Sequence, residues 1–198
     1  MRVVLASRNQ HKLDELKPIL APVGLTLESQ ADHDVPSPDE TGTTFVENAI
    51  IKARTVSEAT GLPALADDSG IVVPALDGAP GIYSARYAGP QASDAENNTK
   101  LVSEISDLEE PVLAYYFCAI VFFSHALDPT PLIATAPWHG HLVTEPRGKN
   151  GFGYDPYFIP KGYEVTSAEL DSTKKNEISH RALACGALLE ELKARNAG

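Results

Sequence analysis

With 198 residues, of which 43% are hydrophobic and 22% charged, the chain has the composition of an ordinary globular protein, and we expect one domain over residues 1–198. Its formal net charge of −11 excludes a sequence-independent grip on DNA or RNA, because such binding relies on lysine and arginine neutralising phosphates. Only two cysteines occur and no apolar run is long enough to span a bilayer, so we expect a cytoplasmic protein without membrane partners.

The first half of the chain alternates strand-like and helical patterns. Strands are expected at residues 3–6, 25–28, 64–66 and 71–74. A first helix carries apolar residues at helical spacing from Leu13 to Leu20. A second helix begins at a capping box, with Thr44 at the N-cap and Glu47 three residues later, and continues to about residue 59.

The second half contains a run of strands between two helices. Helices are expected at residues 94–105 and 179–195, and strands at 112–123, 132–136 and 138–143, with a break at Pro137. Alternation early in the chain and consecutive strands later indicate an α/β protein with a mixed sheet.

Two adjacent acids, Asp67 and Asp68, stand between two expected strands and precede Ser69 and Gly70. Carboxylates held at the edge of a rigid sheet suit coordination of a hard cation such as Mg²⁺ and the orientation of a water. The alternative is a surface turn, because Asp, Ser and Gly are common turn formers.

Residues 7–12 join the first strand to the first helix. Ser7 and Asn9 could donate hydrogen bonds to a phosphate at the helix N-terminus, and Lys12 could supply positive charge, although either polar residue could instead simply cap the helix.

The second helix offers a comparable set of polar residues. Asn48 and Lys52 share one face of it, and Glu40, just before its start, could reach a metal also held by Asp68. A capped surface helix with a solvated lysine is the alternative.

Two later segments carry aromatic and basic residues. Gly151 and Gly153 flank Phe152, a pattern that suits a loop stacking on a ring, or else a structural turn with core aromatics. Lys174-Lys175 and Ser179-His180-Arg181 could read the carbonyl oxygens of a base, or form a solvated basic turn.

Six segments together resemble one known family. They read S-R-N-Q-H-K at 7–12, E-T-G-T-T-F-V-E-N-A-I-I-K-A at 40–53, D-D-S-G at 67–70, P-G-I-Y-S-A-R-Y at 80–87, G-F-G-Y-D-P at 151–156 and S-H-R at 179–181. In this order and spacing they are similar to the inosine/xanthosine triphosphate pyrophosphatase family of house-cleaning enzymes, over about residues 2 to 190.

The resemblance implies a function and a fold. The function is Mg²⁺-dependent hydrolysis of nonstandard purine nucleoside triphosphates (ITP, dITP and XTP) to the monophosphate and pyrophosphate, which cleanses the nucleotide pool. The implied fold is an elongated mixed β-sheet flanked by helices, in two lobes with a central cleft, usually as a homodimer.

The resemblance also implies roles for individual residues. Ser7, Asn9, Lys12 and Lys52 would hold the triphosphate, Glu40 and Asp68 the metal, and Asp68 would also act as the base that activates water. Ser69 would support the substrate. Phe152 and Gly153 would form the stacking side of the base site, Tyr154 and Asp155 would close it, and Lys175, His180 and Arg181 would contact the base edge. Arg8 departs from the family, which often has glycine there, and we expect it to face solvent.

Three other functions compete with this one. A nucleotide-binding sensor without turnover would use the same phosphate contacts, but would not need a water-activating acid. A phosphatase that removes the terminal phosphate is disfavoured because Asp67-Asp68 lacks the Asp-x-Asp spacing of aspartyl-phosphate enzymes. A zinc hydrolase built on His139-x-His141 lacks an evident third ligand.

Overall fold

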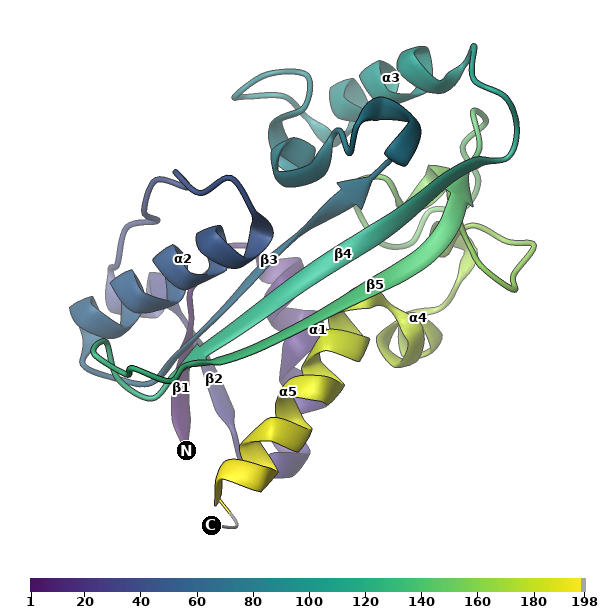
Figure 1. Ribbon diagram of the computed structural model, residues 1–198. Helices are drawn as coiled ribbons and strands as arrows, with labels where there is room; N and C mark the ends of the chain where they lie inside the picture. The colour runs from purple at the N-terminus through teal and green to yellow at the C-terminus, as the bar shows by residue number, and fades with distance from the viewer. Residues whose placement is uncertain (197–198) are drawn as a thin grey trace. The chain divides into compact units, whose positions relative to one another are not determined.

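Six strands form one mixed sheet in the order β2-β1-β3-β4-β5-β6 in the computed structural model, which describes residues 1–196 except for the side chain of Asn196 (Figure 1). The strands are β1 (Arg2–Leu5), β2 (Thr26–Ser29), β3 (Ala64–Val72), β4 (Val112–Phe123), β5 (Leu132–Leu142) and β6 (Phe158–Pro160). The α-helices are α1 (Gln10–Leu20), α2 (Phe45–Thr60), α3 (Asp94–Ile105), α4 (Ser172–Ile178) and α5 (His180–Asn196). Short 3₁₀ helices lie at Ala21–Val23, Gln30–His33, Pro74–Leu76, Gly81–Arg86, Asp155–Tyr157 and Ser167–Glu169.

Strand directions confirm the predicted mixed α/β sheet. Strand β1 is parallel to β2 and β3, whereas β5 is antiparallel to β6. The pairing of β1 with β3 covers only Val4 and Leu5, which lie opposite Ala64 and Leu65. The second half of β3 therefore continues beyond the end of β1.

The chain divides into two compact units, and β3, β4 and β5 each contribute residues to both. The first unit comprises Met1–Asp68, Cys118–Ala136 and the chain from Arg181 onward. Its apolar core is formed by strand residues together with Leu16 of α1 and Leu188 of α5, both fully buried. Helices α1 and α5 therefore cover the same face of these strands, and α2 lies on the other side (Figure 1).

The second unit comprises Ser69–Phe117 and Pro137–His180 and has a core of its own. Four aromatic side chains (Tyr116, Trp138, Tyr154 and Phe158) are buried among its aliphatic residues. The ring of Tyr116 meets that of Phe158 edge-on at 4.9 Å between centroids and stacks with Trp138 at 6.2 Å. Leu101 and Ile105 of α3 are buried in the same core.

Two predicted interruptions of strands are wrong. Residues 64–66 and 71–74 were expected as separate strands, but β3 runs without a break from Ala64 to Val72 and includes both acids. The break expected at Pro137 is also absent, because β5 is continuous. In β3 the polar residues are held by tertiary partners, which override their preference for turns.

The remaining differences concern two short elements and the start of one helix. Helix α4 and strand β6, of seven and three residues, were not predicted because they are too short to show periodicity. The helix expected at 179–195 begins one residue later, at His180. Within residues 1–196 no helix has the length and apolar character needed to cross a membrane.

Candidate active site

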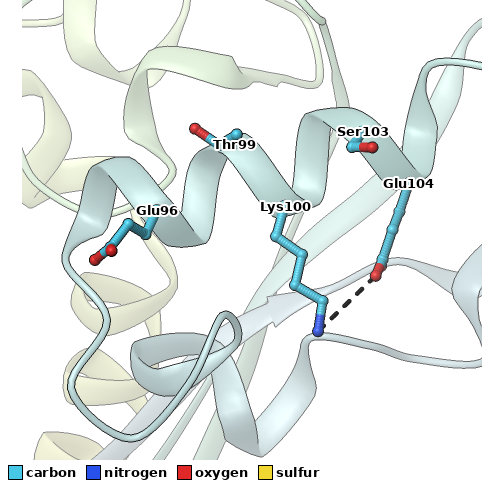
Figure 2. Close-up of a pocket in the computed structure, with 5 residues that line it drawn as sticks. All are labelled: Glu96, Thr99, Lys100, Ser103 and Glu104. Atoms are coloured by element: carbon cyan, nitrogen blue, oxygen red, sulfur yellow. Dashed lines mark ion pairs between the residues drawn. The ribbon is translucent and has the colours of Figure 1, made fainter.

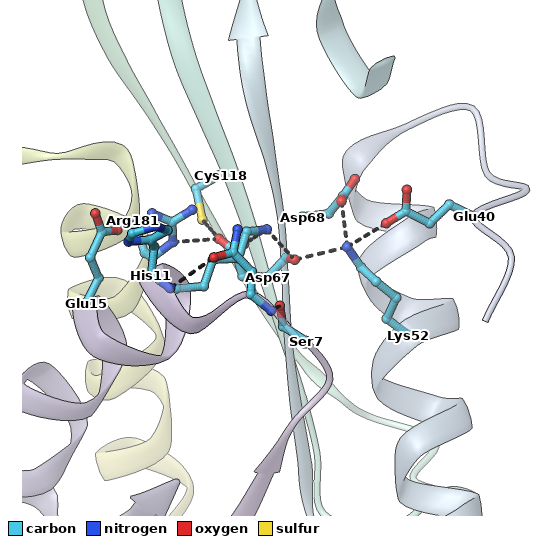
Figure 3. A network of polar contacts seen from close by, with 11 residues as sticks. Ser7, His11, Glu15, Glu40, Lys52, Asp67, Asp68, Cys118 and Arg181 are labelled. Atoms are coloured by element: carbon cyan, nitrogen blue, oxygen red, sulfur yellow. Dashed lines mark hydrogen bonds and ion pairs between the residues drawn. The ribbon is translucent and has the colours of Figure 1, made fainter. Parts of the chain in front are cut away.

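Adjacent positions in β3 direct Asp67 and Asp68 to opposite faces of the sheet, since successive strand side chains alternate. Figure 3 shows Asp67 together with Arg181 and Cys118, and Asp68 together with Lys52 and Glu40. One pair of acids thus organises two groups of side-chain contacts, both within the first unit.

Asp67 is the centre of a buried ion-pair cluster. Its carboxylate pairs with Lys12 of α1 and, at 3.0 Å, accepts a hydrogen bond from Nε of Arg181 at the start of α5. The thiol of Cys118 donates to Asp67 Oδ2 at 3.0 Å, and Arg181 also pairs with Glu15 of α1. The side chain of Asp67 is fully buried, so these partners replace its contacts with water.

The cations decide the charge state of Asp67. Burial alone would raise its pKa, but Arg181 and Lys12 outweigh burial and hold the pKa well below the usual range of an aspartate. Burial raises the pKa of Cys118 well above that of a free thiol, which keeps it protonated as a donor. The cluster is therefore ionised at Asp67 and neutral at Cys118.

Asp68 and Glu40 converge on the ammonium group of Lys52, which is buried on α2. Lys52 Nζ lies 2.6 Å from Asp68 Oδ1 and 3.0 Å from Glu40 Oε1. Burial works against the charge of Lys52, but the two carboxylates outweigh it and raise its pKa. Burial raises the pKa of Asp68, and Lys52 offsets only part of that shift. A carboxyl with a raised pKa is suited to accept a proton.

The backbone carbonyl of Asp67 links the two lysines. It accepts hydrogen bonds from Lys12 Nζ at 3.3 Å and from Lys52 Nζ at 3.0 Å. Strand β1 ends at Leu5, and the next residue, Ala6, donates its backbone N–H to Leu65 O of β3 at 2.8 Å. The carbonyl group of Asp67 lies two residues further along β3, and the side chains of Lys12 and Lys52 donate hydrogen bonds to it.

Ser7 and Asn9 shape the turn between β1 and α1. Asn9 is the N-cap of α1 and accepts a hydrogen bond from His11 N at 2.9 Å, while Ser7 Oγ accepts from Asn9 N at 3.1 Å. Asn9 therefore caps the helix, which was the alternative to phosphate binding considered for this residue. Arg8 is exposed as expected, and it donates to Val35 O at 3.1 Å.

The segment carrying Glu40 is held against α2. The predicted capping box is present, with Thr44 and Glu47 exchanging hydrogen bonds. Asn48, fully buried, accepts a hydrogen bond from Gly42 N at 2.9 Å. These contacts fix the chain two residues after Glu40 and so direct its side chain toward Lys52.

In the second unit, Asp155 organises the loop that carries Phe152. Asp155 is buried, and its Oδ2 accepts hydrogen bonds from Phe152 N at 2.9 Å and Lys175 Nζ at 2.7 Å. Ser167 Oγ donates to the other carboxylate oxygen at 2.9 Å. The same Lys175 ammonium lies 5.0 Å from the centroid of the Phe152 ring, a cation–π distance.

Tyr154 and His180 are both buried in the second unit. Tyr154 donates its hydroxyl proton to Ser84 O at 2.7 Å, and burial raises its pKa. The imidazole of His180 stacks on the ring of Tyr116 at 4.8 Å between centroids, with the planes 10° apart. Both side chains are therefore fixed by the protein itself.

The predicted site residues fall into two sets. The first unit holds Ser7, Asn9, Lys12, Glu40, Lys52, Asp68 and Arg181, and the second holds Ser69, Phe152, Gly153, Tyr154, Asp155, Lys175 and His180. Arg181, expected at the base edge, pairs with Asp67 and Glu15. Among the described residues, no group of three or more His, Cys, Asp or Glu side chains is placed to hold a metal, and this includes His139 and His141.

Several residues of these clusters were missed by sequence reasoning. Glu15 lies three positions after Lys12 on α1, a spacing that could have signalled a shared face. Cys118 and Ser167 gave no such signal, because each reaches its partner from a distant part of the chain.

Comparison with known proteins gives one consistent family. A model of the Ham1 family matches residues 3–191. A dITP/XTP pyrophosphatase from Legionella pneumophila (strain Lens) is 52% identical over 187 residues, which cover 94% of this chain and 95% of that protein. The solved structure of a HAM1 protein from Coxiella burnetii has a TM-score of 0.91 at 46% identity and covers 98% of this chain and 99% of that one. A dITP/XTP pyrophosphatase from Mycobacterium abscessus superposes with a TM-score of 0.76 at 39% identity, covering 97% and 100% of the two chains.

Proposed function

The chain belongs to the Ham1 family, and from this premise we propose that it hydrolyses nonstandard purine nucleoside triphosphates (ITP, dITP and XTP) to the monophosphate and pyrophosphate. Relatives about 50% identical over nearly the whole chain are named dITP/XTP pyrophosphatases, which supports this nucleoside triphosphate pyrophosphatase activity and the resemblance seen in the motifs. The observation that carries the proposal within the protein is the convergence of Asp68 and Glu40 on Lys52.

The donor set of the first unit fits a magnesium ion bound together with substrate. Mg²⁺ is typically held by one or two carboxylates, several waters and substrate phosphates, and Glu40 and Asp68 are two carboxylates already directed to one cation. We assign Glu40 and Asp68 as the metal-binding residues, and Mg²⁺, when bound, would neutralise charge on the phosphates.

Charge in the first unit gives a second reason for a divalent cation. The two clusters contain three cations (Lys12, Lys52 and Arg181) and four carboxylates (Glu15, Glu40, Asp67 and Asp68), so they carry one net negative charge. A triphosphate is a polyanion and would be repelled by such a set. Binding therefore requires added positive charge.

The two lysines and the turn after β1 would bind the triphosphate. Lys12 and Lys52 both lie at the carbonyl of Asp67, and they would reorient their ammonium groups toward the phosphates. Ser7 and Asn9 would contribute hydrogen bonds from the start of α1, where the helix dipole favours an anion.

Asp68 is assigned as the general base. It would accept a proton from the water that attacks the α-phosphorus, and the bond between that phosphorus and the bridging oxygen to the β-phosphate would break. The released proton resides on Asp68 and pyrophosphate leaves. The raised pKa of Asp68 suits proton acceptance, and Ser69, next in β3, would support the substrate there.

The second unit supplies the groups suited to a base. Phe152 would stack on the purine, with Gly153 and Tyr154 beside it, and Asp155 would hold Lys175 in place. Lys175 and His180 would donate hydrogen bonds to the 6-oxo group and the base edge, whereas the guanidinium of Arg181 is paired with Asp67 and Glu15 in the first unit. Adenine carries an amino group at position 6, which is itself a donor, so the buried donors of the protein would stay unpaired. Such a mismatch allows about 10⁴-fold discrimination between 6-oxo purines and adenine.

The substitution Asp68→Asn tests the assignment of the base. It removes the proton acceptor while keeping shape, so at saturating Mg²⁺, where Glu40 still offers a metal ligand, turnover of ITP should fall about 10²- to 10⁴-fold while nucleotide binding persists. Steady-state hydrolysis and calorimetric binding measure the two effects, with Asp107→Asn, an exposed acid in a loop, as the matched control. Unchanged turnover in Asp68→Asn would show that Asp68 is not the general base. A wild-type protein that binds ITP without cleaving it would instead favour a nucleotide-binding sensor.

We further propose a single functional domain over residues 1–198, acting as a homodimer in the cytoplasm. Both cysteines are free and buried, as a reducing compartment favours. Sedimentation at micromolar concentration distinguishes a dimer from a monomer.

A further inference from the structure

Helix α3 holds the backbone of Gly153 through two side chains. Asp94 Oδ2 accepts a hydrogen bond from Gly153 N at 2.8 Å, and Asn98 Nδ2 donates to Gly153 O at 3.0 Å. Asp94 and Asn98 are four residues apart and so lie on the same face of the helix. Together they hold both polar backbone groups of one residue, an arrangement called here the Gly153 clamp.

The clamp acts at a position with unusual backbone geometry. Gly153 has a φ of +61°, in the left-handed region that favours glycine. Its neighbours in the chain are Phe152 and Tyr154. The ammonium group of Lys175 lies over the ring of Phe152, and the hydroxyl group of Tyr154 donates a hydrogen bond to Ser84 O. Because Gly153 follows Phe152 in the chain, fixing the backbone of Gly153 also restricts the orientation of the Phe152 side chain.

Asn98 provides a second, independent observation. Its side chain is buried, with 9% of the residue exposed, and within residues 1–196 its Oδ1 atom has no hydrogen-bond partner. Turning the amide over would place Oδ1 against Gly153 O, two acceptors in contact, so the bond to Gly153 determines the orientation. A buried acceptor without a partner costs stability, which an apolar residue of similar size would avoid.

We propose that Asp94 and Asn98 are positioning residues that set the place of the Phe152 ring for nucleobase binding, without contacting the reacting phosphates. The inference rests on the proposed function, because it assigns Phe152 to the base. It adds a determinant of base affinity that lies on α3, outside the motifs that carry the family resemblance.

Another face of α3 supplies the control. Glu96, Thr99, Lys100, Ser103 and Glu104 line a shallow surface hollow (Figure 2). Thr99 donates its hydroxyl proton to Ala95 O within the same helix, and Lys100 pairs with Glu104 at 4.0 Å. Substituting Thr99 therefore perturbs α3 without touching the clamp.

The experiment compares binding of the two reaction products by calorimetry in the presence of Mg²⁺. Asn98→Leu removes the donor and the unpartnered acceptor together, so the fold should be kept. The dissociation constant for inosine monophosphate should rise about three- to tenfold, while that for inorganic pyrophosphate stays unchanged. Thr99→Ala should alter neither constant.

A conservative pair at the other clamp residue refines the test. Asp94→Asn keeps an oxygen that accepts from Gly153 N and should retain most of the affinity for inosine monophosphate, whereas Asp94→Ala should lose it to the same extent as Asn98→Leu.

Each remaining outcome decides against the inference. Wild-type affinity for inosine monophosphate in Asn98→Leu would make the clamp purely structural, and equal losses for both products would indicate general damage rather than positioning. If the wild type binds pyrophosphate but not inosine monophosphate, the inference fails because Phe152 does not hold the base. Failure of the proposed function itself would be seen separately, as a wild type that releases no pyrophosphate from ITP.

Discussion

Asp67 shows how much a single buried side chain can organise. It pairs with Lys12 and Arg181, accepts from Cys118, and offers its backbone carbonyl to Lys12 and Lys52. We expect Asp67→Asn to lower the free energy of unfolding by about 3 kcal/mol, because it removes the buried counter-charge of Lys12 and leaves Arg181 paired with Glu15. Urea denaturation measures the change, and Glu190→Gln, which removes an exposed ion pair with Lys193, should stay within about 0.5 kcal/mol of wild type.

The same carboxylate predicts how stability depends on pH. Its folded-state pKa lies below the value of about 3.9 in an unfolded chain, so its contribution to stability is complete above about pH 5 and is lost as the pH falls through 4 toward the folded-state pKa. The difference in unfolding free energy between wild type and Asp67→Asn should therefore shrink in acid. A constant difference between pH 7 and pH 3 would show that Asp67 is not held ionised.

At the scale of elements, the pairing of β5 with β6 leaves little room at Gly140. A Cβ atom there would overlap Ile159 O and the ring of Phe158 on the neighbouring strand. Gly140→Ala should destabilise the protein by about 1–3 kcal/mol, the usual cost of overpacking. Thermal unfolding measures this, and a stability equal to wild type would show that the two strands separate easily.

Gly186 provides the opposite case on α5. It is exposed, and a Cβ atom there would meet no other atom within 4 Å. Gly186→Ala should stabilise the protein by about 0.5–1 kcal/mol, because alanine loses less conformational freedom in a helix. A fall in the unfolding temperature would contradict the packing seen around α5.

Local patterns predicted some elements well and others badly. Helix α3 and strand β4 have the predicted bounds, because each has a strong period and clear flanking residues. Strand β3 was divided in the prediction, since Asp67 to Gly70 carry turn-forming residues whose partners come from α1, α2 and α5. Those partners are distant in sequence, so local reasoning could not supply them.

The candidate site shows the same limit. Lys12, Glu40, Lys52 and Asp68 were predicted from spacing and the family resemblance, and the structure brings them to one strand. The contacts of Asp94 and Asn98 with Gly153 were not predicted, because they join residues more than 50 positions apart.

At the scale of the whole molecule, net charge governs what can bind. The chain has a formal net charge of −11, and the side chains of the ion-pair clusters around Asp67 and Asp68 also sum to a negative charge. Neither the whole chain nor these clusters would therefore attract a polyanion without a bound cation. Removing divalent cations with EDTA should abolish calorimetric binding of ITP as well as its hydrolysis, and excess Mg²⁺ should restore both. Tight binding of ITP in EDTA would show that the lysines suffice without a metal.

The proposed pyrophosphatase activity is tested by ³¹P NMR of the purified protein with Mg²⁺ and, separately, ITP, XTP, GTP and ATP. We predict pyrophosphate and the monophosphate from ITP and XTP, with little product from GTP and ATP. Orthophosphate and the diphosphate from ITP would contradict the assigned bond cleavage, and equal turnover of all four nucleotides would contradict the assigned selection of the base.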